Sequence, residues 1–293
     1  MNVNTLIEAR NISYSAESSF SLLKKNTTID IIKNVSFELY QGEILGIVGE
    51  SGCGKTTLAK IISGVTLNTS GEIKKHLLTN KISPIQILFQ NSEELINPFR
   101  KCRSILNDAS NDHESLTEVL SEVNADKKLL NSWGYQLSGG ERQRIALARL
   151  LVVKPEILIL DEPFSAQDYK SKINFIELLR NINRKQNITI ICITHELDLL
   201  NDFVNRIMVM YKGKIIETSI TNNFSTSLKH PYSQFLLESG NYKIKREDFK
   251  KNISQQPTAC EYYERCDKKS EKCISEVAII QNDSSTIHCN HPY

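Results

Sequence analysis

Residues 49–56 read Gly-Glu-Ser-Gly-Cys-Gly-Lys-Thr, and this stretch is the strongest indication of the fold. The largely apolar residues 43–48 come before it and predict a strand, and residues 55–63 continue it as a predicted helix. Glycines let the backbone curl so that successive N–H groups point inward at phosphate oxygens, and a helix N-terminus attracts the same anion. The stretch therefore predicts a phosphate-binding loop between a strand and a helix.

The side chains and glycines of this loop supply the expected nucleotide ligands. Lys55 is expected to bridge the β- and γ-phosphates, Thr56 to place its hydroxyl on Mg²⁺, and Thr57 to reach the α-phosphate. Cys53 occupies a variable position, and we expect no catalytic thiol there. The remaining loop positions expected around the phosphates are Gly49, Ser51, Gly52 and Gly54.

A second chemical feature closes another apolar run. Residues 157–162 read Ile-Leu-Ile-Leu-Asp-Glu, which predicts a buried strand with two carboxylates at its carboxyl end. Open α/β sheets bind ligands at that edge. We expect Asp161 to hold Mg²⁺ through its water shell and Glu162 to polarise the attacking water. Taken alone, the two acids are equally well explained as surface residues at a strand end.

The apolar pattern elsewhere predicts strands that alternate with helices. Strands are expected at 85–89 and 188–193, and helices at 141–153 and 170–183, which together imply an α/β fold with a mostly parallel sheet. Before them, residues 6–14 and 35–39 alternate like half-buried strands, and the polar residues 15–30 are expected to form a loop or hairpin extension.

Composition limits the function classes. The formal net charge is +2, which gives no reason to expect nucleic acid as a partner. No apolar run approaches the roughly 18 residues of a membrane helix, and no signal peptide is visible. We therefore expect a cytoplasmic protein that other chains would have to hold at a membrane.

A third motif separates the possible classes of phosphate-binding-loop protein, which include kinases, GTPases and helicases. Residues 137–144, the signature segment, read Leu-Ser-Gly-Gly-Glu-Arg-Gln-Arg. Ser138, Gly139 and Gly140 precede a predicted helix, so they form a second helix N-terminus that can receive an anion. A head-to-tail dimer explains why one chain carries two such elements, because this segment can cover the γ-phosphate held by the partner's loop.

The motifs together resemble the ATP-binding subunit of an ABC transporter over roughly residues 5–240. The resemblance implies that Tyr14 stacks on adenine, that Gln90 contacts Mg²⁺ and water, and that His195 touches the γ-phosphate. It places Asp168 in the family's D-loop, where this chain has Gln167 in place of the usual leucine. The implied fold is a P-loop core of ABC-cassette type with an N-terminal antiparallel β subdomain, a short helical subdomain and a small cysteine-containing C-terminal segment.

Further residues resemble the importers of oligopeptides, dipeptides and nickel. They are Asn97-Pro98 with Arg100, and the run Lys229-His230-Pro231-Tyr232. The polar insertion at residues 15–30 favours the F-type subunit of these importers over the D-type. Only 46 residues separate Gln90 from Leu137, fewer than is usual in these importers, so the helical subdomain is expected to be trimmed.

Four cysteines lie in the last 34 residues of the chain, with gaps of five, six and fifteen residues between them. The resemblance implies a [4Fe–4S] cluster, as in some members of this group. The spacing itself fits neither a compact zinc knuckle nor a ferredoxin run, so zinc and unligated thiols stay open. His288 and His291 are further candidate ligands. The four cysteines are Cys260, Cys266, Cys273 and Cys289.

The resemblance implies a transport-coupled ATPase with ATP and Mg²⁺ as its ligands. We expect an ATP-binding domain at residues 5–240, followed at 241–293 by a linker and the cysteine-rich segment. The implied partners are transmembrane permease subunits, a second ATP-binding subunit and, indirectly, an extracytoplasmic solute-binding protein, with the chain on the cytoplasmic face of the membrane. Two alternatives remain: a non-transport ABC ATPase acting on ribosomes or DNA, and a regulatory module with a redox-sensing tail.

Overall fold

The computed structural model describes residues 4–18, 27–77, 83–90, 96–110, 112–165, 167–220, 223–240 and 258–293. The chain divides into two compact units, each drawn from several stretches of sequence. The first unit combines residues 1–6, 40–44 and 76–193, and the second combines residues 7–39, 45–75 and 194–293. The linker expected after residue 240 lies outside the described residues, which resume at residue 258.

The first unit contains three parallel strands. These are β5 (Ile85–Leu88), β6 (Ile157–Asp161) and β7 (Thr189–Ile193), and β6 pairs with both of the others. Every residue of β6 and β7 is buried. Parallel strands covered on both faces need continuous apolar runs, so the sequence pattern identified all three within a residue or two.

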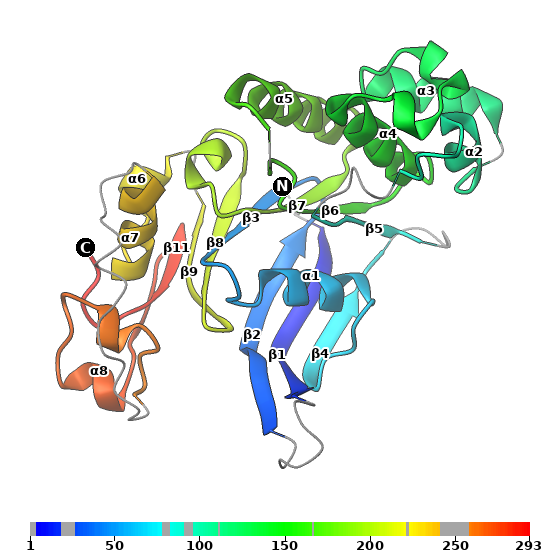
Figure 1. Cartoon of the computed structure of the whole chain (residues 1–293). Helices are drawn as coiled ribbons and strands as arrows, with labels where there is room; N and C mark the ends of the chain where they lie inside the picture. The colour runs from blue at the N-terminus through cyan, green and yellow to red at the C-terminus, as the bar shows by residue number, and fades with distance from the viewer. Residues whose placement is uncertain are drawn as a thin grey trace. The chain divides into compact units, whose positions relative to one another are not determined.

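The helices of the first unit include the long α4 (Gly139–Leu151) and α5 (Tyr169–Gln186). The short α2 (Cys102–Asn107) and α3 (His113–Glu122) pack against α4 (Figure 1). Two single turns, η2 (Lys127–Asn131) and η3 (Gly134–Gln136), lead to the start of α4. These short elements form the helical subdomain that the sequence predicted between residues 91 and 136.

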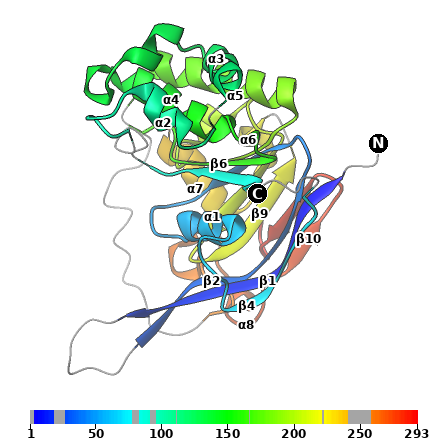
Figure 2. The ribbon, with the colours of Figure 1, turned by 90° about the vertical axis from the view of Figure 1, so that its right-hand side faces the viewer.

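The second unit begins with the antiparallel β subdomain. Strands β2 (Thr27–Tyr40), β1 (Thr5–Ser18) and β4 (Ser70–Lys75) lie in the order β2-β1-β4 (Figure 2). Both long strands continue into residues 15–30, which agrees with the hairpin extension predicted there as the alternative to a loop. A hydrogen bond of 2.7 Å from Ser15 Oγ to Asp30 Oδ1 joins the two strands where the sequence pattern had turned polar.

A second sheet in this unit is mostly antiparallel. Its strands β10 (Ile279–Gln281), β11 (Ser285–His288), β9 (Lys214–Ile220), β8 (Arg206–Tyr211) and β3 (Ile44–Val48) follow in that order. Only β3 and β8 are parallel among them. The parallel pairing expected from sequence is present at β3 with β8, and at β5, β6 and β7 of the first unit, whereas β8, β9, β11 and β10 pair antiparallel. The reason is the tight turn at Lys212 and Gly213, both at positive φ, which joins β8 and β9 as a hairpin.

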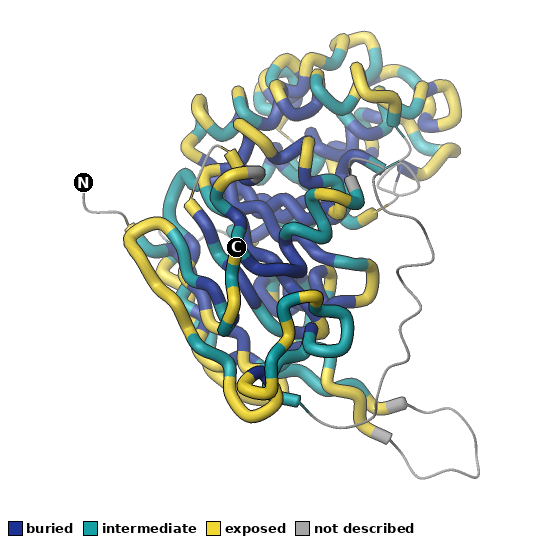
Figure 3. The backbone as a smooth tube through the Cα atoms, turned by 90° about the vertical axis from the view of Figure 1, so that its left-hand side faces the viewer, coloured by how far each residue is buried: buried dark blue, intermediate teal, exposed yellow. Residues whose placement is uncertain are grey.

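The helices of the second unit are short. They are α1 (Lys55–Ser63), η4 (Leu197–Leu200), α6 (Phe224–Ser227), α7 (Pro231–Gly240), η6 (Tyr263–Arg265) and α8 (Lys272–Ser275). Residues of β3 and most of β8 are buried, whereas the C-terminal segment from residue 258 is mostly intermediate or exposed (Figure 3). That segment has little core of its own and depends on what it docks against.

Candidate nucleotide site and cysteine pocket

The phosphate-binding loop, residues 49–56, follows β3 and ends in α1, as the sequence predicted. Gly49 has φ of 151°, and a Cβ there would lie 2.2 Å from the carbonyl oxygen of Met210. Gly54 has φ of 110°, and its Cβ would lie 2.8 Å from Ile32 Cδ1. Larger residues cannot adopt this path, so the glycines permit the tight curl that turns backbone N–H groups inward.

Lys55 opens α1 with its side chain buried at 7% exposure. Its Nζ donates hydrogen bonds to the carbonyl oxygens of Gly49 at 2.6 Å and Glu50 at 3.0 Å. Gly54 has no side chain to cap the helix, so the positive end of α1 faces the loop. Burial raises the pKa of the Cys53 thiol.

The two predicted acids lie at the carboxyl end of β6. Asp161 is the last residue of the strand and is 3% exposed. Glu162 has a left-handed backbone with φ of 52°, and its N–H donates to the carbonyl oxygen of Ile193 at 2.9 Å. The Ser165 hydroxyl donates to the carbonyl oxygen of Glu162 at 3.1 Å, which closes the turn. A non-glycine residue in this conformation is strained, and such strain concentrates at functional sites.

The signature segment begins α4 as predicted. Ser138 caps the helix and forms a capping box with Glu141, whose carboxylate accepts from the Ser138 N–H at 2.8 Å and from its hydroxyl at 2.7 Å. The two hydrogen bonds from Ser138, the backbone one first, lower the pKa of Glu141. Ser138 and Gly140 are exposed at this end of the helix.

A buried amide network, missed from sequence, joins α4 to the segment after β6. Gln143 is 5% exposed, and its Nε2 donates to the carbonyl oxygen of Pro163 at 2.8 Å. Gln167 donates to Gln143 Oε1 at 2.8 Å and to the same carbonyl oxygen at 3.2 Å. Leucine could make none of these bonds, so the structure gives Gln167 a physical role at its unusual position. An open pocket of about 440 Å³ lies beside this network, lined by Gly139, Gly140 and Asp168 among others.

The other predicted nucleotide residues are spread over both units. In the second unit, Tyr14 is half-buried on β1, and His195 is exposed just after Thr194, whose N–H donates to the carbonyl oxygen of Ile47 at 3.2 Å. In the first unit, Gln90 is exposed just after β5. Asp168 caps α5, and hydrogen bonds from the Ser171 hydroxyl and N–H lower its pKa.

Comparison with known proteins decides the family. The family model described as ABC transporter matches residues 32–165. The oligopeptide transport ATP-binding protein OppF of Haemophilus influenzae is 31% identical over 98% of this chain and 97% of that protein. The oligopeptide transport ATP-binding protein AppF of Bacillus subtilis is 30% identical over 94% of this chain and 93% of that protein.

The chain belongs to the ABC transporter ATP-binding family. Its fold matches a solved dimeric bacterial ABC transporter cassette, MJ0796, with a TM-score of 0.62 at 25% identity over 75% of this chain and 100% of that one. A post-hydrolysis state of the same cassette, bound to ADP and Pi, gives a TM-score of 0.62 at 24% identity. The predicted family and ATPase fold are thereby confirmed. Within the described residues, the cassette has no helix with the length and apolar character to cross a membrane.

The C-terminal cysteines of the cassette lie around one pocket. Its lining includes all four of them together with His230 and His291. Among the described residues, no group of three or more His, Cys, Asp or Glu side chains is close enough to hold a metal ion. The four thiols therefore converge on one pocket without forming the tight set that a single ion requires.

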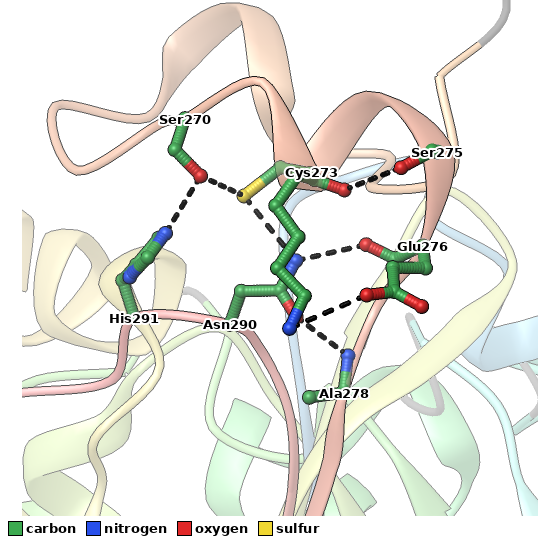
Figure 4. Close-up of polar contacts among 8 residues, drawn as sticks. Ser270, Cys273, Ser275, Glu276, Ala278, Asn290 and His291 are labelled. Atoms are coloured by element: carbon green, nitrogen blue, oxygen red, sulfur yellow. Dashed lines mark hydrogen bonds and ion pairs between the residues drawn. The ribbon is translucent and has the colours of Figure 1, made fainter.

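Polar groups surround the sulfur atom of Cys273 (Figure 4), and one contacts that of Cys289. Ser270 Oγ lies 3.7 Å from Cys273 Sγ and 2.7 Å from His291 Nε2, and Asn290 Nδ2 donates to Cys273 Sγ at 3.6 Å. The N–H of His291 donates to Cys289 Sγ at 3.3 Å. Burial raises the pKa of Cys273, but the hydrogen bonds from Ser270 and Asn290 outweigh it and leave that pKa lowered.

The other three thiols have raised pKa values, and burial is the main cause in each. The pKa of Cys266 rises to about 11, and those of Cys260 and Cys289 also rise. Electrostatic repulsion from another of the four cysteines raises the pKa of each of these three thiols further. A bound metal would reverse this balance, because a positive ion favours thiolates.

Proposed function

We propose that the cassette binds and hydrolyses ATP to energise an ABC importer of dipeptides, oligopeptides or a related small solute such as nickel. Two observations support this most: a phosphate-binding loop curled by glycines in front of an uncapped helix N-terminus, and near full-length similarity to oligopeptide transport ATP-binding proteins.

The proposed reaction converts ATP and water to ADP and phosphate. Binding is assigned to the loop, where Lys55 contacts the β- and γ-phosphates and Thr57 the α-phosphate. Backbone N–H groups at Gly49, Ser51, Gly52 and Gly54 receive the remaining phosphate oxygens. Tyr14 is assigned to the adenine ring. This arrangement positions the γ-phosphate and spreads its negative charge over donors that are already in place.

Mg²⁺ is assigned to three oxygen-bearing side chains, Thr56, Gln90 and Asp161. Hydroxyl, amide and carboxylate oxygens are the hard ligands that this ion prefers, so the donor set fits it. The ion would neutralise charge on the phosphates. Glu162 is assigned to polarise the attacking water, and His195 to stabilise the γ-phosphate.

The signature segment is assigned to the nucleotide of a facing cassette. Ser138, Gly139 and Gly140 begin α4 with exposed or half-exposed positions, which suits an anion brought by another chain. Asp168 is assigned to the same interface. We propose that the facing cassette is a paralogue or a second copy of this chain.

The remaining partners follow from the ABC transporter family. A cassette of this kind is peripheral to the membrane and acts with permease subunits, here on the cytoplasmic face. A solute-binding protein outside the membrane would contribute only indirectly. Residues 5–240 are proposed as the ATP-binding domain and 241–293 as a linker with the cysteine-bearing segment.

For the cysteine pocket we favour a [4Fe–4S] cluster, with zinc as the alternative. Such a cluster takes one thiolate on each of four iron atoms, so its ligands stand further apart than those of one zinc ion. The convergence of all four thiols on one pocket supports a group that they bind together. Hydrogen bonds to Cys273 and Cys289 would tune it, and the bound group would stabilise a segment with little core.

Replacing Glu162 tests the proposed chemistry. Glu162→Gln should retain MgATP binding, hold the ATP-bound dimer closed and lower turnover by about a hundredfold or more, as loss of a general base does. The measurements are phosphate release and size-exclusion chromatography with MgATP. Glu118→Gln, on the exposed face of α3, is the matched control and should hydrolyse ATP normally. Normal turnover by Glu162→Gln would remove Glu162 from the mechanism.

A further inference from the structure

The C-terminal segment is built onto the second unit by backbone pairing. Strand β11 pairs antiparallel with β9, with Ile287 opposite Glu217, and β10 continues the sheet (Figure 1). The N–H of Ile220 donates to the carbonyl oxygen of Ser284 at 2.7 Å, and that of Tyr293 to the carbonyl oxygen of Lys229 at 2.8 Å. The segment therefore has a defined position on the unit that carries the phosphate-binding loop.

One side chain of this segment reaches into the loop. Arg265 forms a bidentate pair with Glu50, from Nη1 to Oε2 at 2.9 Å and from Nη2 to Oε1 at 2.8 Å. The two side chains are only 19% and 32% exposed, and the guanidinium lies 4.9 Å from the ring centroid of Phe235. Paired, planar and partly shielded guanidinium–carboxylate contacts are among the stronger charged contacts in proteins.

Glu50 is held at its backbone as well. Its N–H donates to Tyr232 Oη at 2.8 Å, and Tyr232 is fully buried. Tyr232 packs edge-on against Tyr262, which stands three residues before Arg265. The carbonyl oxygen of Glu50 in turn accepts from Lys55 Nζ at 3.0 Å. One loop residue thus links the C-terminal segment to the lysine expected to bind phosphate.

A second ion-pair group anchors the same segment without touching the loop. Glu261 pairs with Lys33 of β2 at 3.5 Å and with Lys214 of β9 at 3.2 Å. Docking of the segment therefore does not depend on Arg265 alone. Loss of the Arg265–Glu50 pair should therefore affect the loop around Glu50 more than it affects docking of the segment.

We infer that Arg265 is a positioning residue of the nucleotide site, acting through Glu50. It neutralises a carboxylate that would otherwise repel the triphosphate, and it fixes the loop in the shape that receives phosphate. The C-terminal segment is thus a working part of the ATP site. The consequence for ATP affinity rests on the proposed function, whereas the consequence for loop shape does not.

The first experiment measures the dissociation constant for MgATP and the split between KM and kcat. Arg265→Gln should raise both the dissociation constant and KM about fivefold, equivalent to about 1 kcal/mol, while kcat stays within about twofold. Glu50→Gln added to Arg265→Gln should restore most of the affinity, because it removes the uncompensated carboxylate. Lys272→Gln, which breaks the exposed Lys272–Glu276 pair of the same segment, is the matched control and should change nothing.

The second experiment reads loop shape without nucleotide. Cys53 is buried in the loop at 6% exposure, so its alkylation rate, followed by peptide mass spectrometry, reports loop opening. Arg265→Gln should speed alkylation of Cys53 severalfold, and Lys272→Gln should not. Equal Cys53 rates in the two variants would overturn the inference, as would a double variant that binds MgATP as weakly as Arg265→Gln. If the unsubstituted cassette did not bind MgATP, the proposed function would be wrong. The alkylation rates of Cys53 would still test the role of Arg265.

Discussion

The amide network between α4 and the segment after β6 makes a quantitative prediction about stability. Gln143→Leu removes the donor to the Pro163 carbonyl oxygen and the acceptor of the Gln167 amide, both at 2.8 Å. Gln143 is 5% exposed, so water cannot replace these bonds. Each of these two buried hydrogen bonds contributes about 0.5–1.5 kcal/mol, while the Gln167 amide keeps its bond of 3.2 Å to the Pro163 carbonyl oxygen. A central loss of about 2 kcal/mol corresponds to a fall in Tm of about 4–8 °C for a domain of this size.

The double variant Gln143→Leu/Gln167→Leu separates this cause from simple loss of packing. Replacing both glutamines also removes the second donor to the Pro163 carbonyl oxygen, the Gln167 amide at 3.2 Å, so the double variant should lose about a further 1–3 kcal/mol relative to Gln143→Leu. Thermal unfolding followed by circular dichroism measures each variant. Gln281→Leu, at an exposed position on β10, is the control and should lie within about 0.5 kcal/mol of the unsubstituted chain. A double variant as stable as Gln143→Leu would refute the reasoning.

Two further predictions concern the loop and the cysteine pocket. Gly49→Ala places a Cβ 2.2 Å from the Met210 carbonyl oxygen, so it should lower the free energy of unfolding by about 3 kcal/mol or more and abolish MgATP binding. A Cβ at Gly52 meets nothing within 4 Å, so Gly52→Ala should cost only about 1–2 kcal/mol of backbone strain. Equal losses of stability in chemical denaturation would contradict the steric argument. Anaerobically purified cassette should show broad visible absorption from iron–sulfur that Cys273→Ser weakens, and a colourless protein containing zinc by elemental analysis would select the alternative.

The sequence missed parts of the fold where patterns were ambiguous. Residues 206–220, which form β8, the turn and β9, were assigned to no element, although their burial is high. For the polar ends of β1 and β2 the sequence left a loop and a hairpin extension open, since hydrogen bonds between distant residues such as Ser15 and Asp30 support strands that apolar alternation does not mark. Tertiary pairing overrides local propensity in such strands.

The short local features around the candidate nucleotide site of this cassette could be predicted from the sequence alone. The glycine-rich turn at residues 49–56, the acids that end β6 and the start of α4 after Ser138 each depend on backbone geometry over a few residues, so spacing alone identifies them. The tertiary structure was needed to show that Arg265 contacts Glu50, 215 positions away in the sequence, and that Gln167 donates a hydrogen bond to Gln143. Those contacts form because packed strands and helices bring distant segments together, and the spacing of residues within a short stretch does not predict them.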